Sequence, residues 1–226
     1  IRSVNLVYDK ARTRKIDYLS IQETKQLANY LINTLNPNFT SKYMILLAIG
    51  TGMRLGEIQG LTWKDINFNF NTISINKSWN YEKEEFQPTK ANSDRTIRIN
   101  NTLIEALKEL KPKQSSDMLF KNQYGTIPSS SAVNKILKES LVNCRIKHNG
   151  FHFHSLRHTH VAYLLSESVD LYIISKRLGH SDVSITSRVY SYLIDEYKQK
   201  SDLKIERSIE KLMSSNFEQE KIKTTN

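Results

Sequence analysis

The segment from Tyr43 to Ile49 constrains the fold most, because its seven consecutive side chains are almost all apolar. A helix that is apolar on every side is stable only when other elements surround it, so we expect a buried helix here. Gly50 and Gly52 are expected to break this helix, and a short helical turn should follow from Arg54 to Leu61. The sequence has no internal repeat, so one main globular unit is predicted.

An amphipathic helix is predicted before the buried one. Ser20 and Glu23 form a capping box, and leucines recur on one face as far as Leu35. Pro37 then ends the pattern, so we expect a helix over about 20–35.

Short alternating runs replace the helical pattern between residues 63 and 100. They predict three small antiparallel strands, at Thr72–Ile75, Glu85–Gln87 and Arg95–Ile99. The polar, turn-rich connection from Pro88 to Asp94 is predicted to be an exposed hairpin that carries Lys90 at its edge.

Helical patterns return after residue 100. They are expected over about 103–110, 129–141, 155–165, 170–178 and 181–193. The predicted fold class is therefore α+β, mainly α-helical, with a small three-stranded antiparallel sheet.

The composition favours a polyanionic partner. Lys and Arg total 33 against 23 Asp and Glu, a net charge of +10, which indicates nucleic acid first, although a merely solvated basic surface gives the same count. No apolar run approaches the ~20 residues that span a bilayer. The N-terminus lacks a signal-peptide pattern and the single Cys144 has no intramolecular disulfide partner, so a reducing, cytoplasmic setting is expected.

Imidazoles, an arginine and a tyrosine are concentrated between residues 152 and 190. His154 and Arg157 stand three residues apart at a helix start, where both can meet one anion, although this pattern also occurs by chance. His180 lies in a break between two helices, where it is either a surface residue or a phosphate ligand. Tyr190 follows ten residues later, a spacing that equally suits a packed core aromatic.

Arg54 comes directly after the buried helix. A guanidinium drawn inward at that position needs an anionic partner. Glu57 is three residues further on and could satisfy it as an ordinary helix-surface pair, which spacing alone favours.

Three linked segments of the chain resemble the sequence boxes of the tyrosine recombinases. TGMRLGEIQGLTWKDI is similar to their first arginine box, and HFHSLRHTHVAYLL with ISKRLGHSDVSITSRVYSYL is similar to their second. The resemblance runs from about Tyr18 to Tyr197 and preserves the order and spacing of the boxes. It implies an integrase-type catalytic domain.

The resemblance also implies roles for individual residues. The matching positions are Arg54 and Arg157 (clamping the scissile phosphate), Lys90 (the hairpin lysine), His154, His180, Tyr190 (the nucleophile) and Glu57 (a supporting acid). Lys90 is the weakest match, because Lys77 and Lys83 are nearby alternatives. The family commonly has a histidine two residues after the nucleophile, whereas this chain has Tyr192.

The implied chemistry explains these residue types. Two guanidiniums stabilise the charge that develops on the nonbridging oxygens of an attacked phosphodiester. Phenol has a pKa near ~10, so Tyr190 needs help in losing its proton, and His154 is the family's candidate for that help. Lys90 would protonate the leaving 5′ oxygen. No cofactor or metal is expected, and a zinc site at the neighbouring histidines His148, His152, His158 and His160 is disfavoured.

The resemblance suggests a division of the chain and a set of partners. Residues 1–17 are expected to be a basic linker or arm, 18–200 the catalytic domain, and 201–226 a C-terminal helix and tail that docks either on a neighbour or on its own chain. The chain begins with Ile, so we expect a fragment that lacks N-terminal arm-binding and core-binding domains. Double-stranded DNA at attachment sites, a homotetramer on that DNA, and excision or host accessory factors are the implied partners.

Within the family, an integrase of a bacterial mobile element is favoured by the Asn-, Ile- and Lys-rich texture. The alternatives are a recombinase that resolves chromosome dimers, a type IB topoisomerase with the same chemistry, and a noncatalytic DNA-binding relic of the fold. The complete set of candidate catalytic residues argues against the relic.

Overall fold

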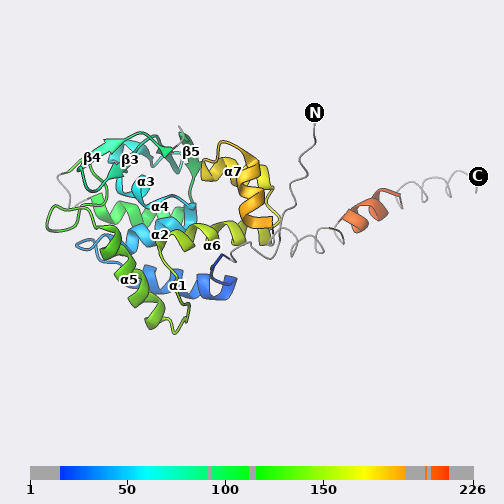
Figure 1. Ribbon diagram of the computed structural model, residues 1–226, viewed down its shortest axis with the longest axis horizontal. Helices are drawn as coiled ribbons and strands as arrows, with labels where there is room; N and C mark the ends of the chain where they lie inside the picture. The colour runs from blue at the N-terminus through cyan, green and yellow to red at the C-terminus, as the bar shows by residue number, and fades with distance from the viewer. Residues whose placement is uncertain (1–15, 91–92, 112–115, 192–201, 203–204, 214–226) are drawn as a thin grey trace, which may run out of the picture.

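The apolar segment expected to form a buried helix lies at the centre of the fold. In the computed structural model, α2 (Ser41–Thr51) keeps every side chain from Tyr43 to Ala48 at no more than 5% exposure. Helices α1, α3, α4, α5 and α6 all pack against it (Figure 1). The prediction of a buried helix is therefore confirmed.

The structure describes residues 16–90, 93–111, 116–191, 202 and 205–213. Its elements in chain order are α1 (Ile21–Asn33), α2, α3 (Leu55–Gln59), the 3-10 turn η2 (Trp63–Asp65), β1 (Ile66–Asn67), β2 (Thr72–Ile75), β3 (Ser78–Asn80), β4 (Glu85–Gln87), β5 (Arg95–Arg98), α4 (Asn101–Leu110), α5 (Ser130–Asn143), α6 (Phe153–Ser166) and α7 (Leu171–Leu178). A further helix covers 183–191, and 205–213 is helical.

The two glycines predicted to break the central helix behave differently. Gly50 lies inside α2, where a Cβ would come within 2.5 Å of the Leu103 side chain on α4. Glycine at this position permits the close approach of two helices, so the prediction of a break at Gly50 is wrong. Gly52 does end the helix, with a φ of 67° in the left-handed region.

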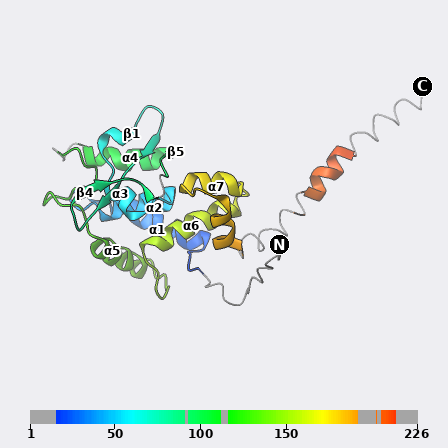
Figure 2. The same ribbon diagram turned by 45° about the horizontal axis from the view of Figure 1, so that its top comes forward.

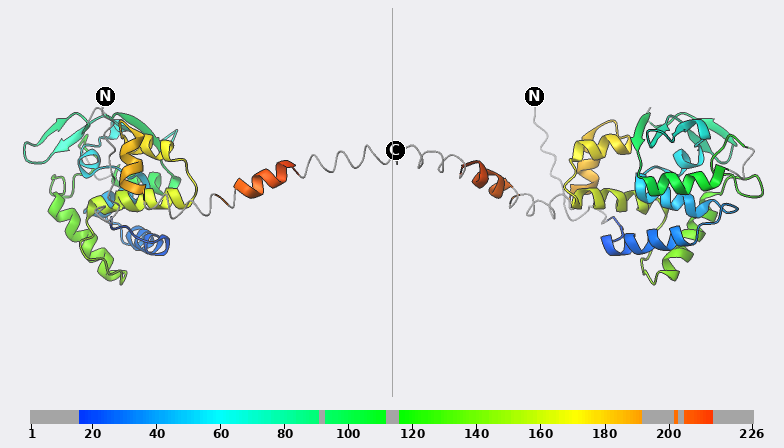
Figure 3. Two further views of the ribbon diagram at one scale, coloured as in Figure 1. Left: turned by 45° about the vertical axis from the view of Figure 1, so that its right-hand side comes forward. Right: turned by 180° about the vertical axis from the view of Figure 1, so that it is seen from behind.

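The predicted strands form, but they belong to two sheets. A three-stranded antiparallel sheet has the order β1-β2-β5, with Ile73 opposite both Ile66 and Ile97. Strand β4 instead pairs with β3 in a separate antiparallel ribbon, which projects from the body (Figure 3). The α+β, mainly helical fold class is confirmed, whereas the assignment of Glu85–Gln87 to the three-stranded sheet is wrong.

The connection that carries Lys90 is therefore not a hairpin turn. Residues 88–94 lead from β4 in the ribbon to β5 in the three-stranded sheet. Thr89 and Ser93 are buried on either side of the exposed Lys90. The connection therefore begins at one sheet and ends at the other, and these two sheets fix the positions of its ends.

Helix α6 begins two residues earlier than expected. His152 is the N-cap, and the Ser155 hydroxyl accepts a hydrogen bond from the His152 backbone N–H at 3.3 Å. Ser155, which looked like the cap residue, is the third residue of the helix and the last position of the capping box. This shift turns His154 into a first-turn residue of the helix.

The elements form layers on either side of α2. The sheets and α3 lie on one side and α1 with α5 on the other (Figure 1), and the turned view in Figure 2 shows α7 beside the end of α6. A second, smaller apolar cluster lies apart from the main core, between α6, α7 and the 183–191 helix. Its fully buried members are Val161, Ala162, Ile174, Leu178 and Tyr190.

The structure describes only part of the two terminal segments that were predicted to flank the catalytic domain. Residues 1–15 of the expected linker, and most of 201–226, lie outside the described residues. The helical residues 205–213 have exposed side chains, including Ile205, Ile209 and Leu212. Among the described helices, none is both long and apolar enough to cross a membrane.

Candidate active site

Arg54 stands at the start of α3, directly after the left-handed turn at Gly52. Its backbone N–H and its Nη1 both donate to the Glu57 carboxylate, each at 2.9 Å. The Arg54 side chain remains 27% exposed, whereas Glu57 is 2% exposed. The ion pair expected from the sequence exists, but it ties an accessible guanidinium to a buried acid rather than lying on a helix surface.

A second arginine, Arg95 on β5, shares the same carboxylate. Its Nη2 and Nη1 donate to the two Glu57 oxygens at 2.8 and 3.2 Å. Burial alone raises the pKa of Glu57, but the hydrogen bonds and charge of Arg95, then those of Arg54, outweigh it and hold the pKa below its usual value. Glu57 is therefore ionised and fixes two cations beside each other.

The Arg157 guanidinium is buried between α2 and α7. Its Nη1 donates to the Gly52 carbonyl at 2.6 Å, and its Nη2 donates to the Leu178 carbonyl at 2.7 Å. Burial, followed by the charge of Arg54, lowers the pKa of Arg157 below its usual value. An anion bound here would relieve that repulsion, so this part of the site favours a phosphate.

His180 lies against Arg157, with 3.0 Å between its Nε2 and the Arg157 Nη2. Because a guanidinium only donates, this contact makes Nε2 the acceptor and leaves the proton on Nδ1, which lies 2.7 Å from Thr186 Oγ1. Burial and then Arg157 lower the pKa of His180 to about 4, so the ring is neutral at neutral pH. Thr186 thus orients a neutral imidazole in the pocket.

His154 lies one helical turn before Arg157, at the exposed start of α6. Partial desolvation, followed by the charge of Arg157, lowers its pKa below the usual value. Arg54 and Lys90 make smaller contributions to the same lowering, so both lie within electrostatic reach of His154.

The two alternative lysines point to other partners. Lys77 Nζ lies 2.7 Å from Asp65 Oδ1, and Lys83 lies 3.8 Å from the exposed Glu85. Lys90 is exposed and, within the described part of the chain, forms no ion pair with a carboxylate. Lys77 and Lys83 are thus each paired with a carboxylate, and the assignment of Lys90 stays a prediction.

Tyr190 lies on the 183–191 helix and is 1% exposed. Its hydroxyl is 2.8 Å from Nδ1 of His158, and the two rings meet edge to face with centroids 5.6 Å apart. Tyr190 also contributes to the electrostatic environment of Arg157. The hydroxyl therefore contacts His158, a residue to which the resemblance gave no role. Tyr192 lies outside the described residues.

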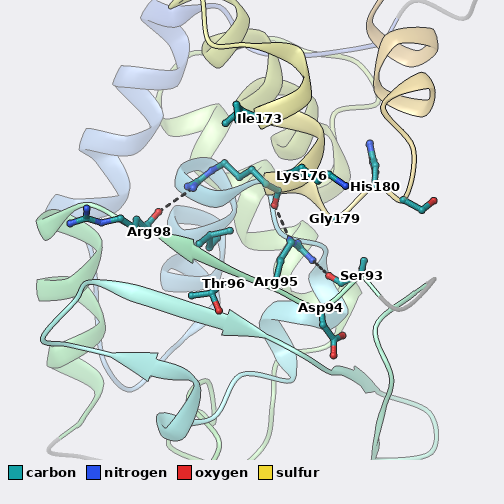
Figure 4. Close-up of a pocket in the computed structure, with 12 residues that line it drawn as sticks. Ser93, Asp94, Arg95, Thr96, Arg98, Ile173, Lys176, Gly179 and His180 are labelled. Carbon is teal, nitrogen blue, oxygen red and sulfur yellow. Dashed lines mark hydrogen bonds between the residues drawn. The ribbon is translucent and has the colours of Figure 1, made fainter.

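Arg95 and His180 both line a cavity of about 600 Å³ between β5 and α7 (Figure 4). Arg95 Nε donates to the Arg177 carbonyl at 2.8 Å, and Arg177 donates to the Arg98 carbonyl at 3.1 Å. These bonds join the sheet to α7, which ends two residues before His180.

The charge distribution suits the attack of a hydroxyl on a phosphodiester. Arg157 contacts the neutral imidazole of His180, and both the guanidinium of Arg54 and the buried phenol of Tyr190 lie near enough to Arg157 to act on its charge. Among the described residues, no group of three or more His, Cys, Asp or Glu side chains is arranged to hold a metal ion.

The sequence matches the phage integrase family over residues 18–196, which is most of the chain. The chain belongs to the phage integrase family. A XerC-like tyrosine recombinase of Caldanaerobacter subterraneus is 30% identical over 70% of the chain, and the match covers 46% of that protein. The integrase of Staphylococcus phage L54a is 26% identical over 91% of the chain and 62% of its own length. This member of the family therefore spans about half to three fifths of these relatives.

Solved structures of phage integrase relatives share the fold. The Tn1549 transposon integrase in complex with a circular intermediate DNA has a TM-score of 0.68 at 18% identity, over 79% of this chain and 62% of that one. XerA recombinase gives 0.64 at 21% identity, over 88% and 69%. The catalytic domain of bacteriophage HP1 integrase gives 0.56 at 18% identity, over 84% and 95%.

Three contacts of this integrase-family site were not predicted from the sequence. Arg95 was assigned only to a strand, Thr186 was not singled out, and His158 was considered only as a metal ligand. Each contact joins residues at least six positions apart, so helical or strand spacing carries no signal for it. Only the i, i+4 spacing of His154 and His158 hinted that two imidazoles share one face.

Gly179 should be intolerant of a side chain. Its φ is 70°, and a Cβ would lie 2.6 Å from Arg95 Nη1 and 2.9 Å from Ser93 Cβ. We expect Gly179→Ala to lower the free energy of unfolding by about 1–3 kcal/mol, measured by urea denaturation, and to slow DNA cleavage. Gly125→Ala is the matched control, because Gly125 has a φ of 74° but nothing within 4 Å of a Cβ. Equal effects of both changes would show that the contact with Arg95 is unimportant.

Proposed function

We propose that the chain is the catalytic domain of a tyrosine site-specific recombinase, an integrase. It cleaves and rejoins double-stranded DNA through a 3′-phosphotyrosyl intermediate on Tyr190. The observation that carries this proposal is the 3.0 Å contact between Arg157 and His180, with Arg54 and Tyr190 close enough to alter the electrostatics of Arg157.

Arg54 and Arg157 hold the two nonbridging oxygens of the scissile phosphate. His180 holds one of them in its other tautomer, in which Nε2 carries the proton and donates it while Nδ1 accepts from the Thr186 hydroxyl. Tyr190 Oη attacks phosphorus, the bond to the 5′ oxygen breaks, and the phenolic proton passes to the imidazole of His154 at the exposed start of α6, while Lys90 protonates the leaving 5′ oxygen. The Glu57 carboxylate holds the Arg54 guanidinium in position by accepting its hydrogen bond. The phosphotyrosine preserves the energy of the phosphodiester for rejoining, so the cycle requires no nucleotide cofactor.

Lys90 is the proposed general acid for the leaving 5′ oxygen. We expect Lys90→Ala to slow cleavage of ordinary DNA by about 10²- to 10⁴-fold. On DNA whose 5′-bridging oxygen is replaced by sulfur, a leaving group that needs no proton, the variant should cleave nearly as fast as the unmodified protein. Single-turnover rates on the two substrates measure the difference. A variant that stays slow on the sulfur substrate would exclude this role for Lys90.

The proposed biological role is integration and excision of a mobile genetic element, phage or otherwise, in the bacterial cytoplasm. The phage L54a integrase aligns with 91% of the chain, which favours this role. The proposed partners are double-stranded attachment sites, three further copies in a homotetramer on that DNA, and excision or host accessory factors. In this proposal residues 18–200 form the catalytic domain, 1–17 are a basic linker or arm, and 201–226 are a C-terminal helix and tail that dock on a neighbouring copy.

The XerC-like relative, at 30% identity, also supports a second candidate, a recombinase that resolves chromosome dimers. The DNA substrate distinguishes the two. Cleavage at the junction of a mobile element favours the integrase, and cleavage at a chromosomal dimer-resolution site favours the alternative.

A covalent trap tests the proposal directly. The substrate is a pool of short duplexes with randomised sequence and a nick beside the cleavage position, so that the released fragment diffuses away and rejoining stops. The expected result is a protein–DNA adduct that survives denaturation, with protein joined to the 3′ phosphate. The absence of any adduct, or an adduct on the 5′ phosphate, would refute the proposal.

A further inference from the structure

Two histidines follow one another on the face of α6 that points to Tyr190. His154 and His158 are four residues apart, and their rings meet edge to face with centroids 5.0 Å apart. His154 is at the exposed start of the helix, whereas His158 is half-buried and lies 2.8 Å from the Tyr190 hydroxyl through its Nδ1. The imidazole that contacts the phenol is thus that of His158, whereas the resemblance assigns a catalytic role to His154.

The packing around Tyr190 makes this hydrogen bond consequential. Apolar side chains of α6 and α7 surround the tyrosine in the smaller cluster, and only 1% of the residue is exposed. Apolar contacts fix the position of the ring, but they do not determine the direction in which its hydroxyl group points. A buried hydroxyl without a partner costs about 1–3 kcal/mol, so the His158 contact selects the direction in which the reacting oxygen lies.

We infer that His158 is a positioning residue for the nucleophile: its Nδ1 holds the Tyr190 oxygen beside the pocket of Arg157 and His180. This inference rests on the proposed function and adds a residue to it. His158 acts on the attacking oxygen, at the opposite side of the phosphorus from Lys90 and the leaving group.

The charge state of His158 suits a constant hydrogen-bond partner. Desolvation, followed by the positive surroundings of His154, Arg157 and His152, lowers the pKa of His158 to about 4. The ring is therefore neutral throughout the neutral and alkaline range. A neutral imidazole has one N–H and one lone pair, so it can accept from the phenol and, in its other tautomer, donate to the phenolate.

Two substitutions separate a hydrogen bond from simple packing. His158→Leu fills the space without a polar atom, and His158→Asn places an amide near the position of Nδ1. Single-turnover cleavage of a selected nicked duplex should slow about 10- to 100-fold in His158→Leu, the loss expected for one hydrogen bond to the reacting oxygen. His158→Asn should restore the rate to within about fivefold of the unmodified protein, because an amide also accepts and donates. The dissociation constant for DNA should stay unchanged in both.

The control is His148→Asn. The His148 ring contacts Asp17 and Glu23, at 2.7 and 3.3 Å, and not Tyr190. It should cleave at the unmodified rate. The inference is overturned if His158→Leu cleaves as fast as the unmodified protein, or if His158→Asn is no faster than His158→Leu.

The sulfur-bridged substrate tells the two sides of the reaction apart. It should rescue Lys90→Ala but leave His158→Leu slow, because sulfur relieves only the leaving group. Rescue of His158→Leu would move its action to the leaving group and overturn the inference. If the unmodified protein forms no adduct at all, it is the proposed function that fails.

A measurement on the folded protein covers the case in which His158→Leu does not fold. Nitrogen NMR of the imidazoles should show a shift of His158 Nδ1 when Tyr190 is changed to Phe, since the hydrogen bond is lost, and little change at His148. An unmoved His158 signal would contradict the contact itself.

Discussion

Tyr190→Phe is expected to abolish the covalent protein–DNA adduct. The change removes only the Oη that would bond to phosphorus, so the rate of adduct formation should fall by more than about 10⁴-fold. The ring keeps its apolar packing against α6 and α7, and the stability loss should stay near ~1 kcal/mol, the value of one hydrogen bond. Denaturing gel electrophoresis after incubation with the nicked duplex measures the adduct, and thermal unfolding measures the stability.

Tyr192→Phe is the control for this experiment, because it removes a phenol two residues away in the sequence. Adduct formation should continue at the unmodified rate. The assignment of the nucleophile is wrong if Tyr190→Phe still forms the adduct, and it moves to Tyr192 if the control variant loses it instead.

Arg157→Lys is expected to impair both stability and cleavage, although it keeps the charge. The guanidinium donates to the carbonyls of Gly52 and Leu178 and also contacts His180, and one ammonium on a flexible chain cannot satisfy all three. Buried carbonyls left without a donor should lower the free energy of unfolding by about 1–3 kcal/mol. Loss of the bidentate phosphate contact should slow cleavage by about 10²- to 10³-fold.

Arg54→Lys provides the matched comparison. Its side chain is 27% exposed, and its partner Glu57 keeps the bidentate pair with Arg95. We therefore expect a similar loss of cleavage with a change in unfolding free energy below about 1 kcal/mol. Urea denaturation and single-turnover cleavage measure the two effects. Equal destabilisation by both substitutions would contradict the different structural roles given to the two arginines.

Local signals in the sequence predicted most of the helices. Ser20 with Glu23, Asp170, and Gly179 act through hydrogen bonds and backbone preferences within one helical turn, so the helix ends they mark were found correctly. The start of α6 was predicted two residues too late, because a serine can be either the N-cap or the N3 residue of a capping box.

The pairing of strands could not be predicted in the same way. Alternation identifies a strand but not its neighbour, and Glu85–Gln87 pairs with the unpredicted β3 rather than with β2. Gly50 is a similar case, since its role depends on the approach of Leu103 from a helix fifty residues later.

By itself, the sequence determined the positions of the elements, the family boxes and the residues proposed for chemistry, because these depend on short spacing and on the side chains themselves. The tertiary structure decided which of these residues meet. It placed Arg95 on Glu57, Thr186 on His180 and His158 on Tyr190. These contacts depend on how α6, α7, β5 and the 183–191 helix pack against one another. Hydrogen bonds between different elements follow from that packing, and no local pattern in the sequence encodes them.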